Sequence, residues 1–353
     1  MKPVLAVLAL ATAATLGVAG AGSSPAKAAA RGLDFYFIDV EGGAATLTVT
    51  PAGESILVDC GWPKQGGRDP KRIESVVRYV AGLDHIDHLV TTHWHTDHYG
   101  GVADLAKLVP IRNYWDRGIP EKATDGARDF DELIAAYKQA TGGKSRTLKP
   151  GDQIPLRQVA GTPVRLKIVS GQGKVIGEGK KALPATCGRH GESPSPDDSD
   201  NALSLGMVIS QGKFGFLNLG DLTWPMEHKL ACPKNRVGQV DLWQVTHHGW
   251  QASGNPALVE ATKPVVAVMT NGARKGASPS VVRMVKSAPS VQALYQVHYA
   301  AGNSAEDNTS RERIANLEEK CQGEFLKVSV APDGSSYTVY KGAGQALETF
   351  RTR

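Results

Sequence analysis

The sequence has few cysteines and lacks any long basic run. Its 353 residues include four cysteines, and no two of these follow the spacing Cys-x-x-Cys. A zinc site built mainly from thiolates is therefore disfavoured. The 40 Lys and Arg residues nearly balance the 35 Asp and Glu residues, which leaves a net charge of +5. Because no polybasic tract is present, the composition gives no strong indication of nucleic-acid binding.

Long apolar runs are also lacking beyond the first thirty residues. Residues 4–18 are apolar and uncharged, they follow Lys2, and residues 26–30 offer the small-x-small pattern of a cleavage site. The run is shorter than the ~20 apolar residues that a membrane-spanning helix needs. We expect residues 1–30 to be a signal peptide. The remaining chain is then exported, periplasmic or secreted, and is not attached to a membrane after cleavage.

An exported chain can form disulfides, and four cysteines can pair in three ways. Cys187 and Cys232 both lie in polar loop sequence and are the preferred pair. Cys60 lies in the apolar run ILVDCG, which is typical of a buried free thiol. Cys321 is left open between pairing and a free thiol.

With 41% hydrophobic and 21% charged residues, the chain can bury a sizeable core. Each half carries strand patterns followed by alternating strands and helices, and no repeat of solenoid length is present. We expect one domain over residues 31–353, with a Gly-, Ser-, Pro- and Asp-rich loop insertion at about 171–200. Helices are expected at 102–108, at 131–140, after Pro279 and around 311–319. The main strands are expected at 35–40, 45–50, 55–59, 86–92, 203–210, 214–219, 242–246, 265–270, 293–299, 325–330 and 336–340.

The strongest chemical signal is a cluster of histidines directly after an apolar strand. Five of the ten histidines lie between residues 85 and 98, and residues 91–101 read TTHWHTDHYGG. His93, His95, Asp97 and His98 follow H-x-H-x-D-H spacing. Imidazole and carboxylate are the zinc ligands that remain when thiolates are absent. The spacing therefore indicates a metal site at the end of this strand.

Two later strand ends offer further ligands of the same kinds. The strand LNLGD ends at Asp221, and the strand LWQVTHHG ends at His247 and His248. Together with the first cluster they supply the extra carboxylate and imidazole that a dinuclear site needs. The pattern does not choose between His247 and His248.

The order H-x-H-x-D-H-x-G-G, then GD, then HHG resembles the metallo-β-lactamase-fold superfamily. The branch that it resembles most contains the hydrolase domain of the DNA-uptake protein ComEC. The segments IDVEGG (38–43), LVDCG (57–61) and PVVAVMTNG (264–272) resemble that branch, as does Asp200-Asn201 followed by Ser204. The resemblance implies an α/β fold, the four-layer αββα sandwich, with metal at one edge of the sheets.

The resemblance also implies roles for individual residues. His93 and His95 hold one ion, Asp97 and His98 hold a second, and Asp221 bridges the two. His247 completes the second site, with His248 as the alternative, and Asp59 orients the histidine loop by hydrogen bonds. Many members supply a third histidine to the first ion, and the candidates for that position here are His190, Asp200 and Asn201. The implied cofactor is one or two Zn²⁺ ions, with Mn²⁺ as an alternative.

The implied activity is hydrolysis by a zinc-activated hydroxide, with Asp97 orienting the nucleophile. His298, at another strand end, is a candidate proton donor or substrate contact, and an ordinary core or surface position is the other interpretation. The favoured function is a phosphodiesterase or nuclease-like hydrolase acting on a small-molecule or phosphodiester substrate. The alternatives are a lactamase or lactonase acting on C–N or C–O bonds, and a metal-binding protein with little turnover. The sequence does not define the oligomeric state.

Overall fold

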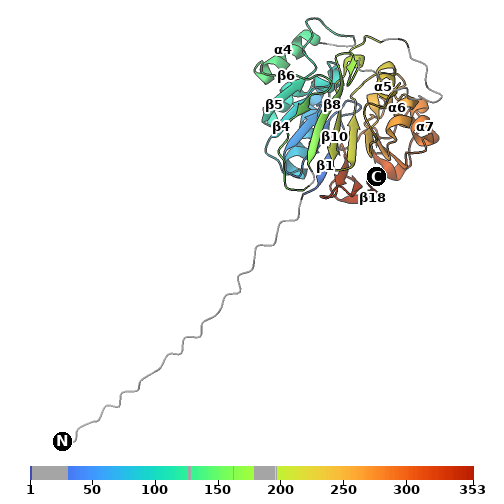
Figure 1. The fold of residues 1–353 in the computed structure, drawn as a ribbon. Coiled ribbons are helices and arrows are strands. Elements are labelled where there is room, and N and C mark those ends of the chain that lie inside the picture. The colour runs from blue at the N-terminus through green and yellow to red at the C-terminus, as the bar shows by residue number, and fades with distance from the viewer. Residues whose placement is uncertain (2–30, 126–128, 162, 179–194, 196) are drawn as a thin grey trace. The chain divides into compact units, whose positions relative to one another are not determined.

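The computed structural model describes Met1 and residues 31–125, 129–161, 163–178, 195 and 197–353 (Figure 1). The expected leader lies outside the described residues apart from Met1, and so do Cys187, His190 and much of the expected insertion. Among the described residues, no helix is long and apolar enough to cross a membrane. The unit Arg31–Arg353 carries all the elements below.

Two large mixed sheets form the centre of this unit. The first has the strand order β18-β17-β16-β1-β2-β3-β4-β5-β6. Its strands are β1 Leu33–Phe37, β2 Thr46–Val49, β3 Ser55–Val58, β4 Ile86–Val90, β5 Ile111–Asp116, β6 Arg146–Thr147, β16 Leu326–Val330, β17 Ser336–Lys341 and β18 Gln345–Arg351. Strands β3, β4, β5 and β6 pair in parallel, whereas the other pairs are antiparallel.

The second sheet has the order β15-β14-β13-β12-β11-β10-β8-β7, with β9 paired to β8. Its strands are β7 Gln153–Ile154, β8 Val164–Gly171, β9 Lys174–Val175, β10 Gly206–Gln211, β11 Phe214–Asn218, β12 Leu242–Gln244, β13 Val266–Met269, β14 Ala293–His298 and β15 Ile314–Asn316. From β11 to β15 all neighbours are parallel. Their carboxyl ends therefore lie along one edge of the sheet.

Helices cover the outer faces of both sheets (Figure 1). They are α1 Arg68–Ser75 (continued by a π-helical turn, Val76–Val80), α2 Thr96–Tyr99, α3 Val102–Leu108, α4 Phe130–Thr141, α5 Trp224–Ala231, α6 Pro256–Thr262 and α7 Pro279–Ser287. Buried apolar side chains form three main clusters. One lies between the sheets, one beneath α1, α3 and α4, and one beneath α5, α6 and α7. Three such cores require four layers, which confirms the predicted αββα sandwich.

The central core shows how the strand pattern fixes the sheets face to face. Alternate residues of β1 point inward, because successive side chains of a strand lie on opposite faces. Phe35 and Phe37 both contact Phe216 of β11, with ring centroids 4.6 and 5.8 Å apart. These aromatic contacts join the two sheets directly, and they add to the burial of apolar area.

One predicted helix is wrong. The segment expected to be helical around residues 311–319 forms a short 3₁₀ turn, Arg311–Arg313, followed by strand β15. Ile314 and Ala315 are buried, and β15 pairs in parallel with the end of β14. Pairing with a neighbouring strand has therefore overridden the local helical pattern.

For Cys232 and Cys60, the structure agrees with the predicted disulfide and the predicted free thiol. Cys232 is disulfide-bonded, and its preferred partner Cys187 lies outside the described residues. Cys60 and Cys321 are free, and Cys60 is fully buried.

The buried carboxyl group of Glu227 on α5 leads to a prediction about stability and pH. Glu227 is fully buried, and its Oε2 accepts a hydrogen bond from the backbone N–H of Asn255 at 2.8 Å. Burial raises the pKa of Glu227 from 4.5 to about 7. The folded protein therefore holds this proton more tightly than the unfolded chain does. Stability from this group is present at low pH and is lost as the pH rises from 4.5 to 7.

We expect Glu227→Gln to remove this loss, because the amide stays neutral at every pH. Between pH 5 and pH 8, the free energy of unfolding of the wild type should fall by about 2–3 kcal/mol more than that of the variant. Urea unfolding of both proteins in the presence of a chelator measures the difference without a contribution from bound metal. Parallel pH profiles for the two proteins would contradict the assignment.

Candidate metal centre

The candidate ligands follow the carboxyl ends of strands in both sheets. Asp59 follows β3 and the histidine loop follows β4, and these two strands are parallel neighbours in the first sheet. Asp221 follows β11 and His247 follows β12, which are parallel neighbours in the second sheet. A backbone hydrogen bond from the N–H of His247 to the carbonyl of Gly220 (3.0 Å) joins the last two segments. Residues far apart in the sequence therefore meet at one edge of the sandwich.

The GD turn has its glycine for a spatial reason. Gly220 has φ +56°, and a Cβ atom placed on it would lie 3.0 Å from the side chain of Thr92. A side chain at this position would push the turn away from the histidine loop. Glycine therefore allows Asp221 to approach the first sheet closely.

Four buried side chains bring one donor atom each to a common point. Asp97, His98, Asp221 and His248 place these atoms within 4.8 Å of one another. The Nε2 atom of His98 lies 3.2 Å from Asp221 Oδ2 and 3.3 Å from Asp97 Oδ2. The Nε2 atom of His248 lies 3.3 Å from Asp221 Oδ2 and 3.4 Å from Asp97 Oδ2. We call these four residues the donor cluster.

Neighbouring groups fix which ring nitrogen each histidine offers. Asp59 Oδ2 accepts a hydrogen bond from His98 Nδ1 at 2.7 Å, as the predicted orienting role of Asp59 requires. Asp59 also accepts from the backbone N–H and the hydroxyl of Thr92, both at 2.8 Å. His248 Nδ1 lies 3.2 Å from the carbonyl oxygen of Thr270 and donates to it. Both histidines are left with Nε2 as the metal-facing atom.

Both histidines of the HHG turn face Asp221, so the structure does not separate them completely. His247 Nε2 lies 3.3 Å from Asp221 Oδ2, and its Nδ1 lies 3.1 Å from the hydroxyl of Ser253. His248 alone of the two belongs to the donor cluster. Both residues have a left-handed backbone, with φ 57° and 53°. Side chains disfavour this conformation, and such strain is often found at functional sites.

His93 and His95 lie beside the donor cluster but are not members of it. His93 is fully buried and its ring centroid is 4.1 Å from that of His98. Among the described residues, its Nε2 has no hydrogen-bond partner. His95 lies 4.8 Å from His93 by ring centroids, and its Nε2 donates to the carbonyl oxygen of Asp125 at 2.6 Å. The structure thus places all the predicted first-motif residues at one edge, with His95 turned toward Asp125.

The two described candidates for the missing third ligand differ sharply. Asp200 is already engaged: its Oδ1 pairs with the buried guanidinium of Arg117, and its Oδ2 accepts from the backbone N–H of Trp94 at 2.6 Å. Asn201 lines the same cavity as His95 and Asp97, and its buried Oδ1 has no partner in the part of the chain that the structure describes. Of these two, only Asn201 has a free donor atom facing the site.

Lys275 is a site residue that the sequence does not indicate. It belongs to the basic pair Arg274-Lys275, and such a pair usually lies in a solvent-exposed turn. Its ammonium contacts Asp97 Oδ2 directly and lies 5.0 Å from the ring centroid of Trp62. In this structure a cation therefore already sits against a carboxylate of the donor cluster. In the sequence, the one sign of this role is that Lys275 lies six residues after the end of β13.

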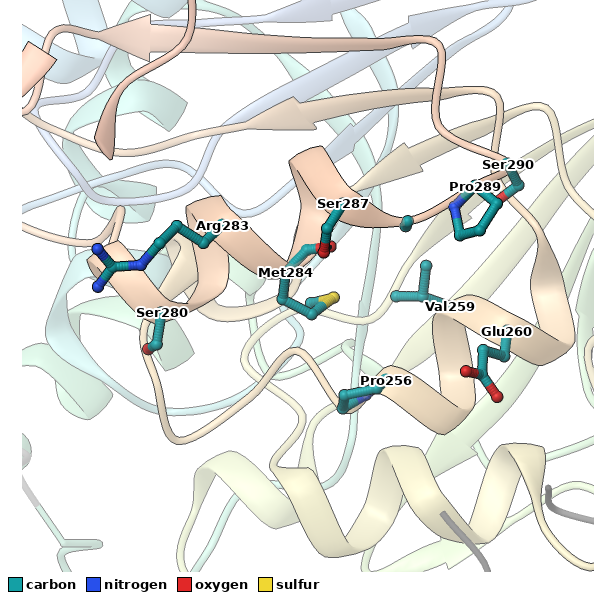
Figure 2. A pocket seen from close by; sticks show the side chains of 10 residues that line it. Pro256, Val259, Glu260, Ser280, Arg283, Met284, Ser287, Pro289 and Ser290 are labelled. Atoms are coloured by element: carbon teal, nitrogen blue, oxygen red, sulfur yellow. Dashed lines mark hydrogen bonds between the residues drawn. The ribbon is translucent and has the colours of Figure 1, made fainter. Parts of the chain in front are cut away.

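The donor cluster opens into a cavity of about 510 Å³. Its wall includes Trp62, Asn201, Trp250 and Lys275, and the side chain of Trp250 is half exposed. A second cavity of about 480 Å³ lies between α6 and α7 (Figure 2). Its lining is mainly apolar, with Glu260 and Arg283 toward its edges, and it contains no residue of the donor cluster. The chemistry therefore points to the first cavity.

The charge states of His93 and Asp221 suit metal binding. Burial, together with the neighbouring imidazoles of His98 and His95, holds the pKa of His93 well below its usual range. Burial opposes ionisation of Asp221, but the three surrounding histidines hold its pKa well below the usual range of a carboxyl group. The site thus offers a neutral imidazole and an ionised carboxylate, the forms that bind metal.

The residues present fit a divalent cation. Bonds of about 2.0–2.1 Å in a tetrahedral zinc site place ligand atoms about 3.3 Å apart, and the donor cluster shows spacings of 3.2–3.4 Å. The Nε2 atom of His93 has no partner within the described ranges and is a further candidate ligand, since a buried polar atom normally has a partner. Nitrogen and oxygen donors without thiolate suit zinc or manganese.

Two facing mixed sheets carry this set of candidate metal ligands at one edge of an α/β fold. Residues 38–184 match the model of the Metallo-beta-lactamase superfamily. The match includes the histidine motif and ends before Asp221.

Two related proteins match the chain over short segments. The chain is 41% identical over 69 residues to the lactamase-like protein GME11357 of Pestalotiopsis microspora, over 19% of this chain and 20% of that protein. It is 44% identical over 64 residues to the thioesterase pkgB of Emericella nidulans, over 18% of this chain and 17% of that protein. The matches thus span about a fifth of each relative. The subclass B3 metallo-beta-lactamase MEM-A1 from a soil metagenome has a TM-score of 0.34 and 15% identity, over 76% of this chain and 77% of that chain.

Proposed function

We propose that the protein is an exported, metal-dependent hydrolase that cleaves phosphodiesters. The observation that carries the proposal is the donor cluster of two carboxylates and two imidazoles at the base of a 510 Å³ cavity. The apolar run at residues 4–18, with its small-residue cleavage pattern, supports export. The segments that resemble the ComEC branch support a phosphodiester substrate.

A bound Zn²⁺ or Mn²⁺ ion supplies Lewis acidity and lowers the pKa of water toward ~7. Asp97 and Asp221 neutralise such an ion, while Asp59 keeps His98 in the tautomer with Nε2 free. His93 stays neutral because it is buried beside other imidazoles. These residues therefore hold the site rigid and limit the reorganisation needed during hydrolysis.

The cavity wall supports an anionic substrate that carries a flat ring. Once a cation has taken over the charge of Asp97, the ammonium of Lys275 is free to pair with a phosphate oxygen. Trp62 and Trp250 offer aromatic faces on the same wall, and bases stack on such faces. Two carboxylates balance one divalent ion, so Lys275 leaves the loaded site with a net positive charge.

The substrate class is tested with the full chain, loaded with Zn²⁺ or with Mn²⁺ in separate samples. Bis(p-nitrophenyl) phosphate is compared with a β-lactam, a lactone and a thioester, and the chelator-treated protein serves as the blank. We expect the phosphodiester to be turned over with the highest kcat/KM. Faster cleavage of any carbonyl substrate would overturn the phosphodiester assignment, and no turnover in any arm would overturn the hydrolase assignment.

Lys275→Gln tests the anion-binding role of this lysine. We expect KM for the phosphodiester to rise roughly tenfold, because a hydrogen bond to a charged group contributes about 1.5–3 kcal/mol. Neutral substrates should be unaffected, and Lys107→Gln, on the exposed face of α3, is the matched control. An unchanged KM for the phosphodiester would show that Lys275 does not contact the substrate.

A further inference from the structure

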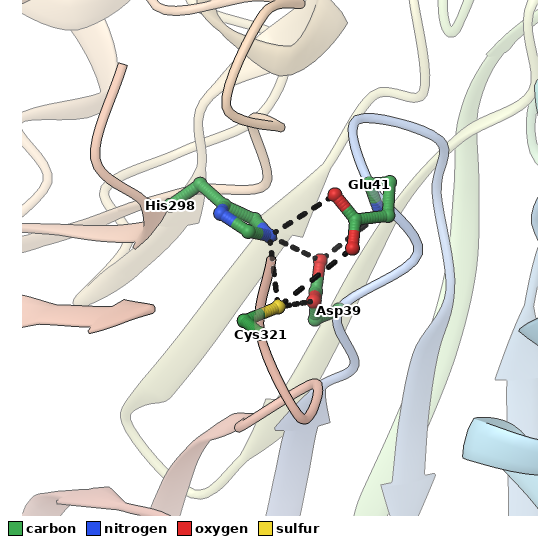
Figure 3. Close-up of side chains that lie close together, drawn as sticks. All are labelled: Asp39, Glu41, His298 and Cys321. Carbon is green, nitrogen blue, oxygen red and sulfur yellow. Dashed lines mark hydrogen bonds and ion pairs between the residues drawn. The ribbon is translucent and has the colours of Figure 1, made fainter. Parts of the chain in front are cut away.

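A second group of metal-type ligands lies outside the donor cluster. It consists of Asp39, Glu41, His298 and Cys321, each of which places one donor atom within 4.8 Å of the others (Figure 3). Asp39 and Glu41 follow β1, His298 ends β14, and Cys321 lies in the loop before β16. Figure 3 shows the four side chains pointing toward one another from these three segments. We propose that this group is a second, structural zinc site, independent of the proposed function.

The spacing of the donor atoms supports this assignment. His298 Nε2 lies 3.0 Å from Asp39 Oδ1 and 3.5 Å from Glu41 Oε2. The Sγ atom of Cys321 lies 3.7 Å from His298 Nε2, and its 3.2 Å contact with Asp39 is to Oδ2, the oxygen that also faces Arg72. Tetrahedral zinc, with bonds of about 2.0 Å to oxygen and nitrogen and about 2.3 Å to sulfur, separates its ligand atoms by about 3.3–3.6 Å. The group is therefore already close to the required size.

The side chain of Arg72 on α1 holds the two carboxylates in place. Its Nη1 lies 2.7 Å from Asp39 Oδ2 and 3.1 Å from Glu41 Oε1. The other oxygen of each carboxylate faces His298. Arg72 thus occupies one oxygen of each carboxylate and leaves one available, in the way that outer groups commonly orient metal ligands.

The charges of the group also match a divalent cation. Two carboxylates and the thiolate of Cys321 carry three negative charges, and Arg72 carries one positive charge. The remaining two negative charges equal the charge of Zn²⁺. Asp39 and His298 are fully buried, so the charge balance matters for their stability.

A metal at this place would fix a loop that contacts residues of the first site. The loop that carries Asp39 and Glu41 continues to Ala44, whose backbone N–H donates to the carbonyl oxygen of Asp97 at 3.1 Å. Gly42 in the same loop packs against Gly272 and Lys275. Zinc held by residues from β1, β14 and the 321 loop would fix this loop, and with it the positions of Asp97 and Lys275.

Cobalt distinguishes the two sites because only the second contains a sulfur donor. Chelator-treated full chain is titrated with Co²⁺, and the near-ultraviolet thiolate-to-cobalt charge-transfer band is recorded. We expect the band in the wild type and in Asp221→Asn, which disrupts only the donor cluster. It should be absent in Cys321→Ser and persist in Cys60→Ala, the control for the other free cysteine. Circular dichroism confirms that each variant is folded.

A second measurement uses zinc itself. Saturating Zn²⁺ should slow alkylation of Cys321 at least roughly tenfold, as measured by mass spectrometry, because a metal-bound thiolate is not free to react. His298→Gln should abolish this protection. The proposal is overturned if the wild type shows no band, if Cys321→Ser retains it, or if zinc leaves the alkylation rate unchanged. Each of these outcomes leaves the assignment of hydrolysis to the donor cluster unchanged.

Discussion

Asp221→Asn is expected to lower kcat for the hydrolysed substrate by roughly 10³-fold, since the metal contributes several kcal/mol to the barrier reduction. The physical reason is the position of the Asp221 carboxylate. Its Oδ2 lies 3.2–3.3 Å from the Nε2 atoms of His98, His247 and His248. Asparagine keeps the shape but removes the charge that holds a cation among these imidazoles. Metal content, measured by mass spectrometry after dialysis, should fall together with kcat.

A matched control separates this effect from general damage. Asp34→Asn changes another buried carboxylate, at the start of β1, which pairs with Ser329 and Lys327 instead of the donor cluster. Its metal content and kcat should stay within twofold of the wild type. If Asp221→Asn retained both full metal content and full turnover, Asp221 would not be a ligand and the proposed centre would be wrong.

The fold and the first motif could be predicted from the sequence because their signals are local. The run Ile86–Val90 is an apolar strand, and the residues directly after it repeat metal-binding types at close spacing. The helix at Val102–Leu108 matches its predicted bounds for the same reason, since its apolar spacing and the following Pro110 are sequence features. Local pattern failed at Ile314–Asn316, where pairing with β14 decides the structure.

Other features depend on contacts that one sequence does not encode locally. His247 and His248 both face Asp221, and each has a left-handed backbone conformation that no strand pattern predicts. Lys275 became a site residue only because its loop packs against Gly42, 233 positions earlier in the chain. The group around Cys321 combines residues up to 282 positions apart, and none of its members lies in a recognisable metal motif. Each of these was missed because the tertiary fold supplies the proximity.

The adjacent residues Asp200 and Asn201 provide the second prediction of large effect, because the structure gives them opposite roles. Asp200 pairs with Arg117, and both side chains are buried. Burial lowers the pKa of Arg117 to about 10, which leaves the guanidinium charged at neutral pH. Asp200→Asn would remove the carboxylate that contacts this guanidinium and leave only the interactions with Asp116 and Asp125. We expect the free energy of unfolding to fall by about 3 kcal/mol, the lower end of what breaking a buried ion pair costs.

For Asn201→Ala we expect the opposite result: the stability is kept and metal binding is weakened. The buried Oδ1 atom of Asn201 has no partner among the residues described, so its removal should change the stability of the metal-free protein by less than about 1 kcal/mol. Loss of a donor next to His95 and Asp97 should weaken metal binding at least roughly tenfold. Urea unfolding with chelator measures the first quantity, and competition with a zinc-binding dye measures the second. If Asp200→Asn instead kept full stability and lost the metal while Asn201→Ala kept it, Asp200 would be the third ligand, and its contacts with Arg117 and Trp94 would have to give way when metal binds.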